Sequence, residues 1–164
     1  MMQARPARPE DAAAITAIYN QGIEDRIATF ETEPRQVADI EAWFAHAKAF
    51  VAVEAGGEVV AYAVAHPYAD RCCYSGIGEF SVYVARGWRG QGAGAVAMAA
   101  LTAAARDAGL WKLLSRVFPQ NRASLKLMAR CGFKEIGVHE KHGKLEGVWM
   151  DTVIVERLIP ENID

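Results

Sequence analysis

The sequence predicts an α+β protein that folds as a single domain over residues 1–164. Apolar residues recur at helical spacing in four segments, and seven shorter segments have the apolar alternation or β-branched content of strands. No internal repeat or low-complexity linker interrupts this pattern. Because two pairs of neighbouring strands, one hairpin and one closing pair, are expected to be antiparallel, we expect a central, mixed and mostly antiparallel sheet of about seven strands, flanked by about four helices.

The first half of the chain predicts one strand, two helices and a hairpin. A short strand at residues 3–7 leads into a helix that begins near Pro9, whose acidic neighbours favour a helix start. A second helix at 37–49 carries one apolar stripe. Two strands within 49–67 are joined at residues 55–58, where adjacent glycines tolerate the positive φ of a tight turn.

The second half predicts a strand at 77–85, with Phe80 and Val82 on one face and Glu79 on the other. A glycine-rich turn follows it and opens a helix that ends near Asp107. The remaining segments are a strand at 110–118, a helix at 121–131, and a closing antiparallel pair of strands at 133–140 and 147–159.

The charge and composition of the chain limit the kinds of partner that we expect. The net charge is −2 and the isoelectric point is near 6.1, so we expect no nucleic-acid partner, because such binding relies on a basic surface. No segment has the apolar length of a membrane span or the core of a signal peptide, so we expect a cytoplasmic protein without membrane contact. Three cysteines, with Cys72 and Cys73 adjacent, predict reduced thiols and no metal site.

Four glycines fall within the nine residues 86–94, directly before a predicted helix. Unpaired backbone N–H groups converge at such a turn, and the helix dipole adds partial positive charge. The pattern therefore predicts an anion cradle. A turn that binds no ligand is a weaker interpretation, because such a turn needs only one or two glycines and this segment has four.

Two nucleotide-binding patterns compete for this turn. A P-loop requires Lys followed by Ser or Thr, and Ala95 and Val96 occupy those positions. Residues 90–95 satisfy the dinucleotide pattern G-x-G-x-x-G/A, but no acidic residue occurs between Ala108 and Lys134 to hold a ribose. Both readings are therefore disfavoured.

A third pattern fits better. Residues 89–94, Arg-Gly-Gln-Gly-Ala-Gly, resemble the (Q/R)-x-x-G-x-(G/A) signature of the GNAT superfamily of N-acetyltransferases, and the predicted order of elements is also that of the family. The resemblance extends from about Gln3 to Leu158, and it implies the GNAT fold. Within the superfamily the chain is similar to the phosphinothricin-type acetyltransferases, and more narrowly to their arsinothricin branch. The segments that carry this similarity are Ala17–Asn20, Ala28–Phe30 with Glu33 and Pro34, Glu79–Val84, Asn121–Ser124 and Trp149–Asp151.

The resemblance implies that acetyl-CoA is the cosubstrate and that no metal is required. The backbone of the strand before the turn would hold the acetyl and pantetheine portion, the turn would hold the pyrophosphate, and the start of the next helix would contact the cofactor. The residues implied are Val82, Tyr83, Val84, Arg89, Gly90, Gln91, Gly92, Ala93, Gly94, Ala95, Asn121 and Ser124.

The resemblance also implies a catalytic base. Glu79 matches the glutamate of the family's catalytic region and stands in an otherwise apolar strand, where partial desolvation suits a carboxylate that must accept a proton. Its alternative role is an exposed carboxylate on a half-covered strand. Many relatives carry a tyrosine or histidine as general acid in the helix after Asn121, and here Met128 occupies that position.

Acceptor residues are implied by two further segments. Arg71 and Tyr74 match an R-x-x-Y segment of the family that suits a carboxylate, although Ser75 stands where a second arginine is usual. Thr29 and Phe30 would form a wall of the pocket. His142 and Lys144, in an expected loop at 140–147, are weaker candidates for additional positive charge.

The resemblance therefore implies acetyl transfer to the α-amine of a glutamate-like amino acid or toxic analogue, such as phosphinothricin, methionine sulfoximine or arsinothricin. The amine would attack acetyl-CoA directly in a ternary complex, and the reaction would detoxify the analogue and confer resistance to it. A peptide N-terminus or a polyamine as acceptor stays open, as does a non-catalytic protein that binds acetyl-CoA only as a sensor. The resemblance also admits a homodimer, because the family commonly dimerises.

Overall fold

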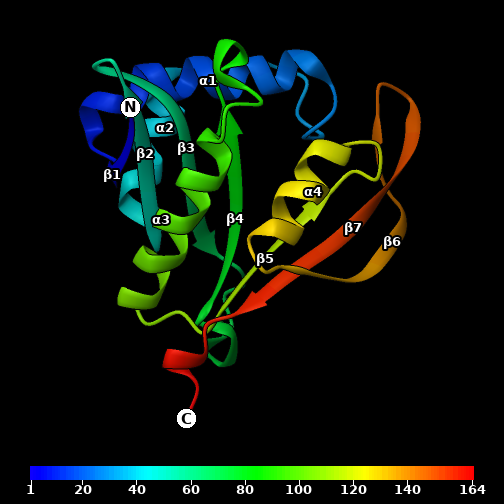
Figure 1. Ribbon diagram of the computed structural model, residues 1–164. Coiled ribbons are helices and arrows are strands. Elements are labelled where there is room, and N and C mark those ends of the chain that lie inside the picture. Colours follow the sequence, from blue (N-terminus) through cyan, green and yellow to red (C-terminus); the bar gives the residue numbers. More distant parts are fainter.

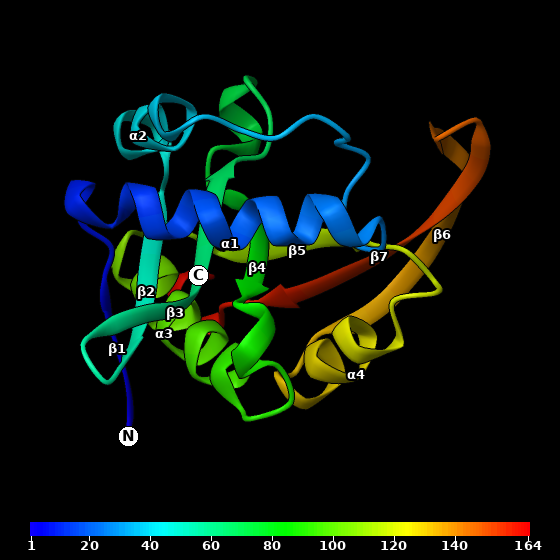
Figure 2. The same ribbon diagram turned by 90° about the horizontal axis from the view of Figure 1, so that it is seen from above.

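A seven-stranded sheet with the order β1-β2-β3-β4-β5-β7-β6 forms the centre of the computed structural model, which describes residues 1–164. Helices α1 and α2 lie on one side of the sheet, and α3 and α4 lie on the other (Figures 1 and 2). The order of helices and strands along the chain is the one that the sequence predicts, and the α+β class is confirmed. The elements are β1 (Met2–Pro6), α1 (Ala12–Asp25), α2 (Val37–His46), β2 (Ala49–Ala55), β3 (Glu58–Pro67), β4 (Ile77–Val84), α3 (Ala93–Asp107), β5 (Lys112–Val117), α4 (Arg122–Arg130), β6 (Lys134–Leu145) and β7 (Val148–Leu158).

All neighbouring strands are antiparallel except β4 and β5, which run parallel. The prediction of a mixed, mostly antiparallel sheet is therefore confirmed. The β2–β3 turn has positive φ at both Gly56 (60°) and Gly57 (83°), which is the geometry of a tight hairpin.

The two faces of the sheet bury two separate cores. The larger core packs α3 and α4 against the sheet through residues such as Leu101, Leu113 and Met128. The smaller core packs α1 and α2 on β3 through residues such as Ile15, Ile40 and Tyr62. Alternate residues of β4 serve both cores, since Phe80 belongs to the first and Tyr83 packs against the second.

The end of the chain differs from the sequence prediction. The loop expected at 140–147 is instead strand, because β6 continues to Leu145 and turns into β7 through Glu146 and Gly147. Both turn residues have positive φ, 49° and 81°, so two residues suffice for the hairpin. A register shift between His139 and Gly143 and a positive φ at Lys141 absorb the polar residues that made this segment resemble a loop.

No helix of the structure is both long and apolar enough to cross a lipid bilayer.

A charged cluster ties β1 to the start of α1. The Arg5 guanidinium donates to both carboxylate oxygens of Asp11 at 2.8 Å and to Glu54 of β2 at 2.8 Å. The backbone N–H of Arg8 donates to Asp11 at 2.8 Å. Hydrogen bonds from Arg5 hold the pKa of Asp11 below its usual range, although burial of the carboxylate opposes them.

Replacing Asp11 with Asn should lower the free energy of unfolding at pH 7 by about 1–3 kcal/mol, since charge-assisted hydrogen bonds are lost. Because the folded-state pKa of Asp11 is depressed, this contribution is complete above the unfolded-state pKa of about 4 and is lost as the pH falls through the folded-state value. Urea unfolding at several pH values measures it, with exposed Glu10→Gln as the control. If the loss of stability in Asp11→Asn stays constant down to pH 2, the Asp11 carboxylate is not the source of this contribution.

Candidate active site

Strands β4 and β5 separate shortly after they begin. They pair only at Ile77, Gly78 and Glu79 of β4, although β4 continues to Val84. Figure 1 shows β4 rising through the centre of the molecule from this shared start, while β5 runs obliquely away from it toward α4. The Ser115 hydroxyl donates to the carbonyl of Phe80 at 2.7 Å, where the gap opens. We call this opening between the two strands the β4–β5 gap.

The β4 edge that faces this gap carries free backbone groups. Ala85 donates to Val60 of β3, and Ile77 accepts from Tyr68, so the hydrogen-bonded pairs with β3 fall on the odd-numbered residues of β4. The backbone groups of Val82 and Val84 therefore face the gap. Tyr83, by contrast, is bonded to β3, so only two of the three residues predicted to hold a ligand by their backbones are placed to do so.

The Tyr83 ring packs beneath α1. It stacks on Tyr62 with ring centroids 5.7 Å apart and lies edge-on to Tyr19 at 5.0 Å. A Cβ added to Gly22 would lie 2.6 Å from the ring, so α1 approaches β4 only because this residue is glycine. Burial raises the pKa of the Tyr83 hydroxyl, which therefore stays protonated.

The glycine-rich turn connects β4 to α3. Gly90 and Gly92 have φ of 77° and 90°, a conformation that residues with a Cβ rarely adopt. Gly92 caps α3 without a side chain, and the first residue to bond back to it is Val96. The N–H groups of Ala93 to Ala95 thus lie in the first turn, where a helix leaves them unpaired. The turn has the backbone geometry of the predicted anion cradle.

Helix α4 borders this turn. Leu127 lies against Gly94, where an added Cβ would be 2.9 Å from its side chain. Asn121 caps α4, because its Oδ1 accepts the N–H of Ser124 at 3.2 Å. Asn121 therefore has the helix-capping role. The Oδ1 atom accepts one hydrogen bond in the cap, and the amide nitrogen is available to contact a ligand.

The arginines of the turn pair with α1. Arg86 and Arg89 donate to the two carboxylate oxygens of Asp25 at 2.9 and 2.6 Å. Burial acts to raise the pKa of Asp25, but the hydrogen bonds from both arginines outweigh it and hold the pKa below its usual range. Arg89 also donates to the Val84 carbonyl at 3.3 Å. Its guanidinium therefore braces the turn against α1, which leaves the anion cradle to backbone groups.

These features fit one extended ligand. The free backbone groups of Val82 and the free N–H of Val84, whose carbonyl already accepts from Arg89, can pair with an extended chain, as an added strand would. The cradle at Gly90–Ala95 can hold a phosphate at the end of that chain. The structure contains no cluster of three or more His, Cys, Asp or Glu side chains that could hold a metal ion.

Glu79 lies at the mouth of the β4–β5 gap. Its carboxylate accepts a hydrogen bond from Nη1 of Arg116 on β5 and is 38% exposed. His66 of β3 is directly opposite Glu79 in register, and burial lowers the pKa of this imidazole. The environment of Glu79 is therefore more polar than an apolar strand predicts. Arg116 was missed by sequence reasoning because it belongs to another strand, and only the parallel register brings it to Glu79.

Thr29 and Phe30, the predicted wall of the acceptor pocket, lie in the loop between α1 and α2. The Phe30 ring meets Phe118 at 4.9 Å and lies against Gly143 of β6, where an added Cβ would be 2.9 Å away. Thr29 accepts the N–H of Glu31 at 3.1 Å. An open pocket of about 280 Å³ is lined by Phe30, Glu31, Thr32 and Glu33.

The other candidates are placed less directly. Arg71 and Tyr74 share the short turn before β4, with the guanidinium carbon 5.9 Å from the ring centroid. His142 stacks on His139 at 4.3 Å, and Lys144 lies 4.9 Å over Trp149, so both belong to the outer β6–β7 hairpin. Met128 is buried in the larger core, so this position of α4 offers no acid.

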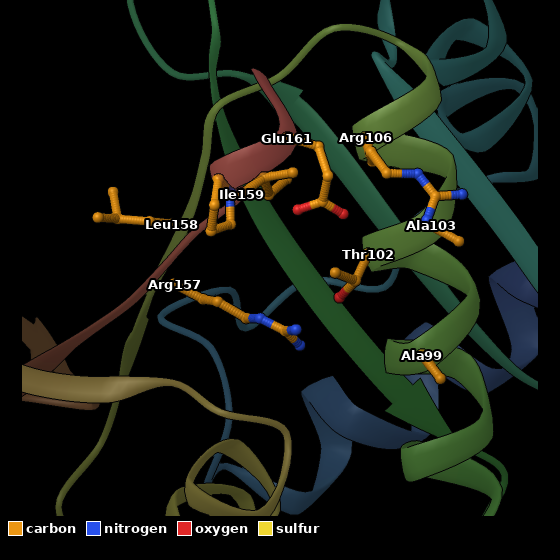
Figure 3. Close-up of a pocket in the computed structure, with 9 residues that line it drawn as sticks. Ala99, Thr102, Ala103, Arg106, Arg157, Leu158, Ile159 and Glu161 are labelled. Carbon is orange, nitrogen blue, oxygen red and sulfur yellow. The ribbon is translucent and has the colours of Figure 1, made fainter. Parts of the chain in front are cut away.

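A second hollow of about 260 Å³ lies on the α3 side of the sheet (Figure 3). Thr102 and Arg106 of α3 face Arg157 and Glu161 across it. None of the residues discussed above lines it, so it is separate from the β4–β5 gap.

The pattern of the acetyltransferase (GNAT) family matches residues 15–133, and this chain belongs to that family. Two curated relatives are similar over most of their lengths. The phosphinothricin N-acetyltransferase of Alcaligenes faecalis is 35% identical over 93% of this chain and 80% of its own. The L-methionine sulfoximine/L-methionine sulfone acetyltransferase of Pseudomonas paraeruginosa is 33% identical over 93% of this chain and 91% of its own.

A solved structure is similar in fold as well. The GNAT superfamily phosphinothricin acetyltransferase of Sinorhizobium meliloti, in complex with acetyl-CoA, superposes with a TM-score of 0.88 at 25% identity, covering 96% of this chain and 88% of its own. The predicted GNAT fold is therefore confirmed.

Replacing Gly22 with Ala should destabilise the protein by about 1–3 kcal/mol, because the new methyl group overlaps the Tyr83 ring. In an unobstructed helix the same change stabilises by about 0.5–1 kcal/mol. Urea unfolding of Gly22→Ala, of Tyr83→Leu and of the double variant measures the coupling between the two positions. In the Tyr83→Leu background Gly22→Ala should become neutral or stabilising. Equal destabilisation in both backgrounds would rule out the overlap.

Proposed function

We propose that the protein transfers an acetyl group from acetyl-CoA to the α-amine of a glutamate-like amino acid or toxic analogue, such as phosphinothricin or methionine sulfoximine. The observation that carries the proposal is the continuous path from the glycine turn, along the free edge of β4, to the carboxylate of Glu79. The names of the two curated relatives support this class of acceptor. Detoxification of the analogue would be the result.

Acetyl-CoA supplies an activated acetyl thioester. The backbone groups of Val82 and Val84 would hold its extended arm, and Gly90 to Ala95 its pyrophosphate, with Gln91 and Arg89 within the same turn. The Asn121 amide nitrogen and Ser124 lie at the start of α4, beside the turn.

Glu79 would receive the proton of the amine, directly or through a water. The amine nitrogen bonds to the acetyl carbon, and the carbon–sulfur bond breaks to release CoA as a thiolate, which then takes a proton from water. A thiol with a pKa near about 8.5 leaves without a dedicated acid, which agrees with a buried Met128 at the family's acid position. Free N–H groups at the β4–β5 gap would stabilise the developing oxyanion.

For the acceptor, Phe30 and Thr29 would form one wall of the pocket. Arg71 and Tyr74, exposed on the turn that precedes β4, would bind the acidic end of the acceptor side chain.

One observation favours a second candidate function, acetylation of a polyamine or a peptide N-terminus. The pocket beside Phe30 carries two carboxylates, Glu31 and Glu33, which suit a cationic acceptor. The Glu31 carboxylate is paired with Arg35, whose Nη2 lies 2.5 Å from Oε1 of Glu31, and this pairing weakens the alternative.

Replacing Gly92 with Ala should weaken acetyl-CoA binding about tenfold or more, because a Cβ disfavours the left-handed backbone that shapes the cradle. Isothermal titration calorimetry measures the dissociation constant. Gly57→Ala is the matched control: Gly57 has a φ of 83°, also has open space around it, and lies in the distant β2–β3 turn. Equal affinity in the two variants would contradict the cradle, and no heat of binding in the parent would overturn the proposed function.

Replacing Glu79 with Gln should lower kcat by about 10²- to 10⁴-fold with a smaller change in KM, since a general base acts on the chemical step. Release of free CoA thiol measures turnover with phosphinothricin, methionine sulfoximine, glutamate, ordinary amino acids and polyamines as acceptors. Glu135→Gln, on the exposed strand β6, should retain parental turnover. Turnover of Glu79→Gln within twofold of the parent would exclude Glu79 as the base. Preference for polyamines would favour the second function, and binding of acetyl-CoA without turnover of any acceptor would identify a sensor.

A further inference from the structure

Arg116 lies at the mouth of the β4–β5 gap, and the proposed reaction assigns no role to its positive charge. It lies on β5, where β5 has already separated from β4, and it reaches back across the gap to Glu79. Phe118, two residues further along the same face, packs on Phe30 of the acceptor wall. Arg116 therefore lies between the candidate base and the wall of the acceptor pocket.

The guanidinium of Arg116 has unused donors. It carries five N–H groups, and Nη1 is the one that bonds to Glu79. The Nε atom is buried and has no hydrogen-bond partner, which is unfavourable for a charged group. The side chain is nevertheless 31% exposed, so an oxygen ligand can reach it from the gap.

Other charged groups of the site are already engaged. Arg86 and Arg89 are paired with Asp25, and Arg35 is paired with Glu31. Arg71 lies on the turn before β4, over the ring of Tyr74. Arg116 is thus the arginine held directly against the candidate base.

An α-amino acid carries an ammonium and a carboxylate on the same carbon. The ion pair of Glu79 and Arg116 presents a negative and a positive group side by side. The carboxylate of Glu79 is complementary to the ammonium of such an amino acid, and the guanidinium of Arg116 is complementary to its carboxylate. We infer that Arg116 binds the α-carboxylate of the acceptor while Glu79 meets its α-amine. This inference rests on the proposed function, and it assigns Arg71 to the distal acidic group instead. Acceptors without an α-carboxylate would offer Arg116 no anionic partner and would be used less well for that reason.

The test compares each amino-acid acceptor with its α-carboxamide, which keeps the amine and the side chain but removes the charge. In the parent, kcat/KM for the free acid should exceed that for the amide by about 10- to 100-fold, as expected for charge-assisted hydrogen bonds. Arg116→Met should reduce this ratio to near one, chiefly by raising KM for the acid. Arg116→Lys, which keeps the charge but loses the planar fork, should restore part of it.

Two controls separate this role from a structural one. Arg130→Met, at the exposed end of α4, should keep the parental ratio. Arg71→Ala should keep the acid-to-amide ratio but lose the preference for acidic over neutral acceptor side chains. Thermal unfolding shows whether each variant is folded. If Arg116→Met does not fold, the acid-to-amide ratio of Arg116→Lys tests the inference in its place.

The inference is overturned if the parent uses acid and amide equally, or if the ratio is unchanged in Arg116→Met and Arg116→Lys. Turnover of amino acids with an unchanged ratio would reject Arg116 alone and leave the proposed function standing. An absence of CoA release with every amino acid would reject both.

Discussion

The separation of β4 from β5 is the constraint on which the rest of the site depends. After three paired positions the two strands diverge, so β4 keeps its bonds to β3 but leaves its other edge free. Free backbone groups at a sheet edge are normally satisfied by another strand. Here the Ser115 hydroxyl satisfies the Phe80 carbonyl where the gap begins. A ligand that pairs like a strand would complete the sheet.

Helix α1 stabilises both ends of this arrangement. Asp25 holds Arg86 and Arg89 of the glycine turn, and Gly22 admits the Tyr83 ring beneath the helix. The loop after α1 then carries Phe30 to Phe118 and Gly143. The cradle, the β4 edge and the acceptor wall are therefore tied to one helix. The arginines of the turn serve mainly as braces, so the cradle relies on backbone N–H groups and on the start of α3.

Electrostatics divide the site into two regions. At the turn, backbone dipoles supply positive potential without a free cation, which suits a diphosphate approached by glycines. At the mouth of the gap, Glu79 and Arg116 form a compact pair beside a largely neutral His66. In a protein of net charge −2, Arg116 thus places a positive group in the gap, directly beside the carboxylate that it neutralises.

Local patterns in the sequence were sufficient to predict the element order, the β2–β3 turn and the glycine-rich turn that opens α3. Each depends on neighbours in the chain, either through apolar periodicity or through closely spaced glycines. Tertiary structure alone decided the rest. The register of β4 and β5 brought Arg116 to Glu79, the β4–β3 pairing withdrew the Tyr83 backbone from the gap, and a two-residue turn made residues 141–145 part of β6. Those outcomes depend on contacts between residues far apart in the chain, which no local pattern encodes.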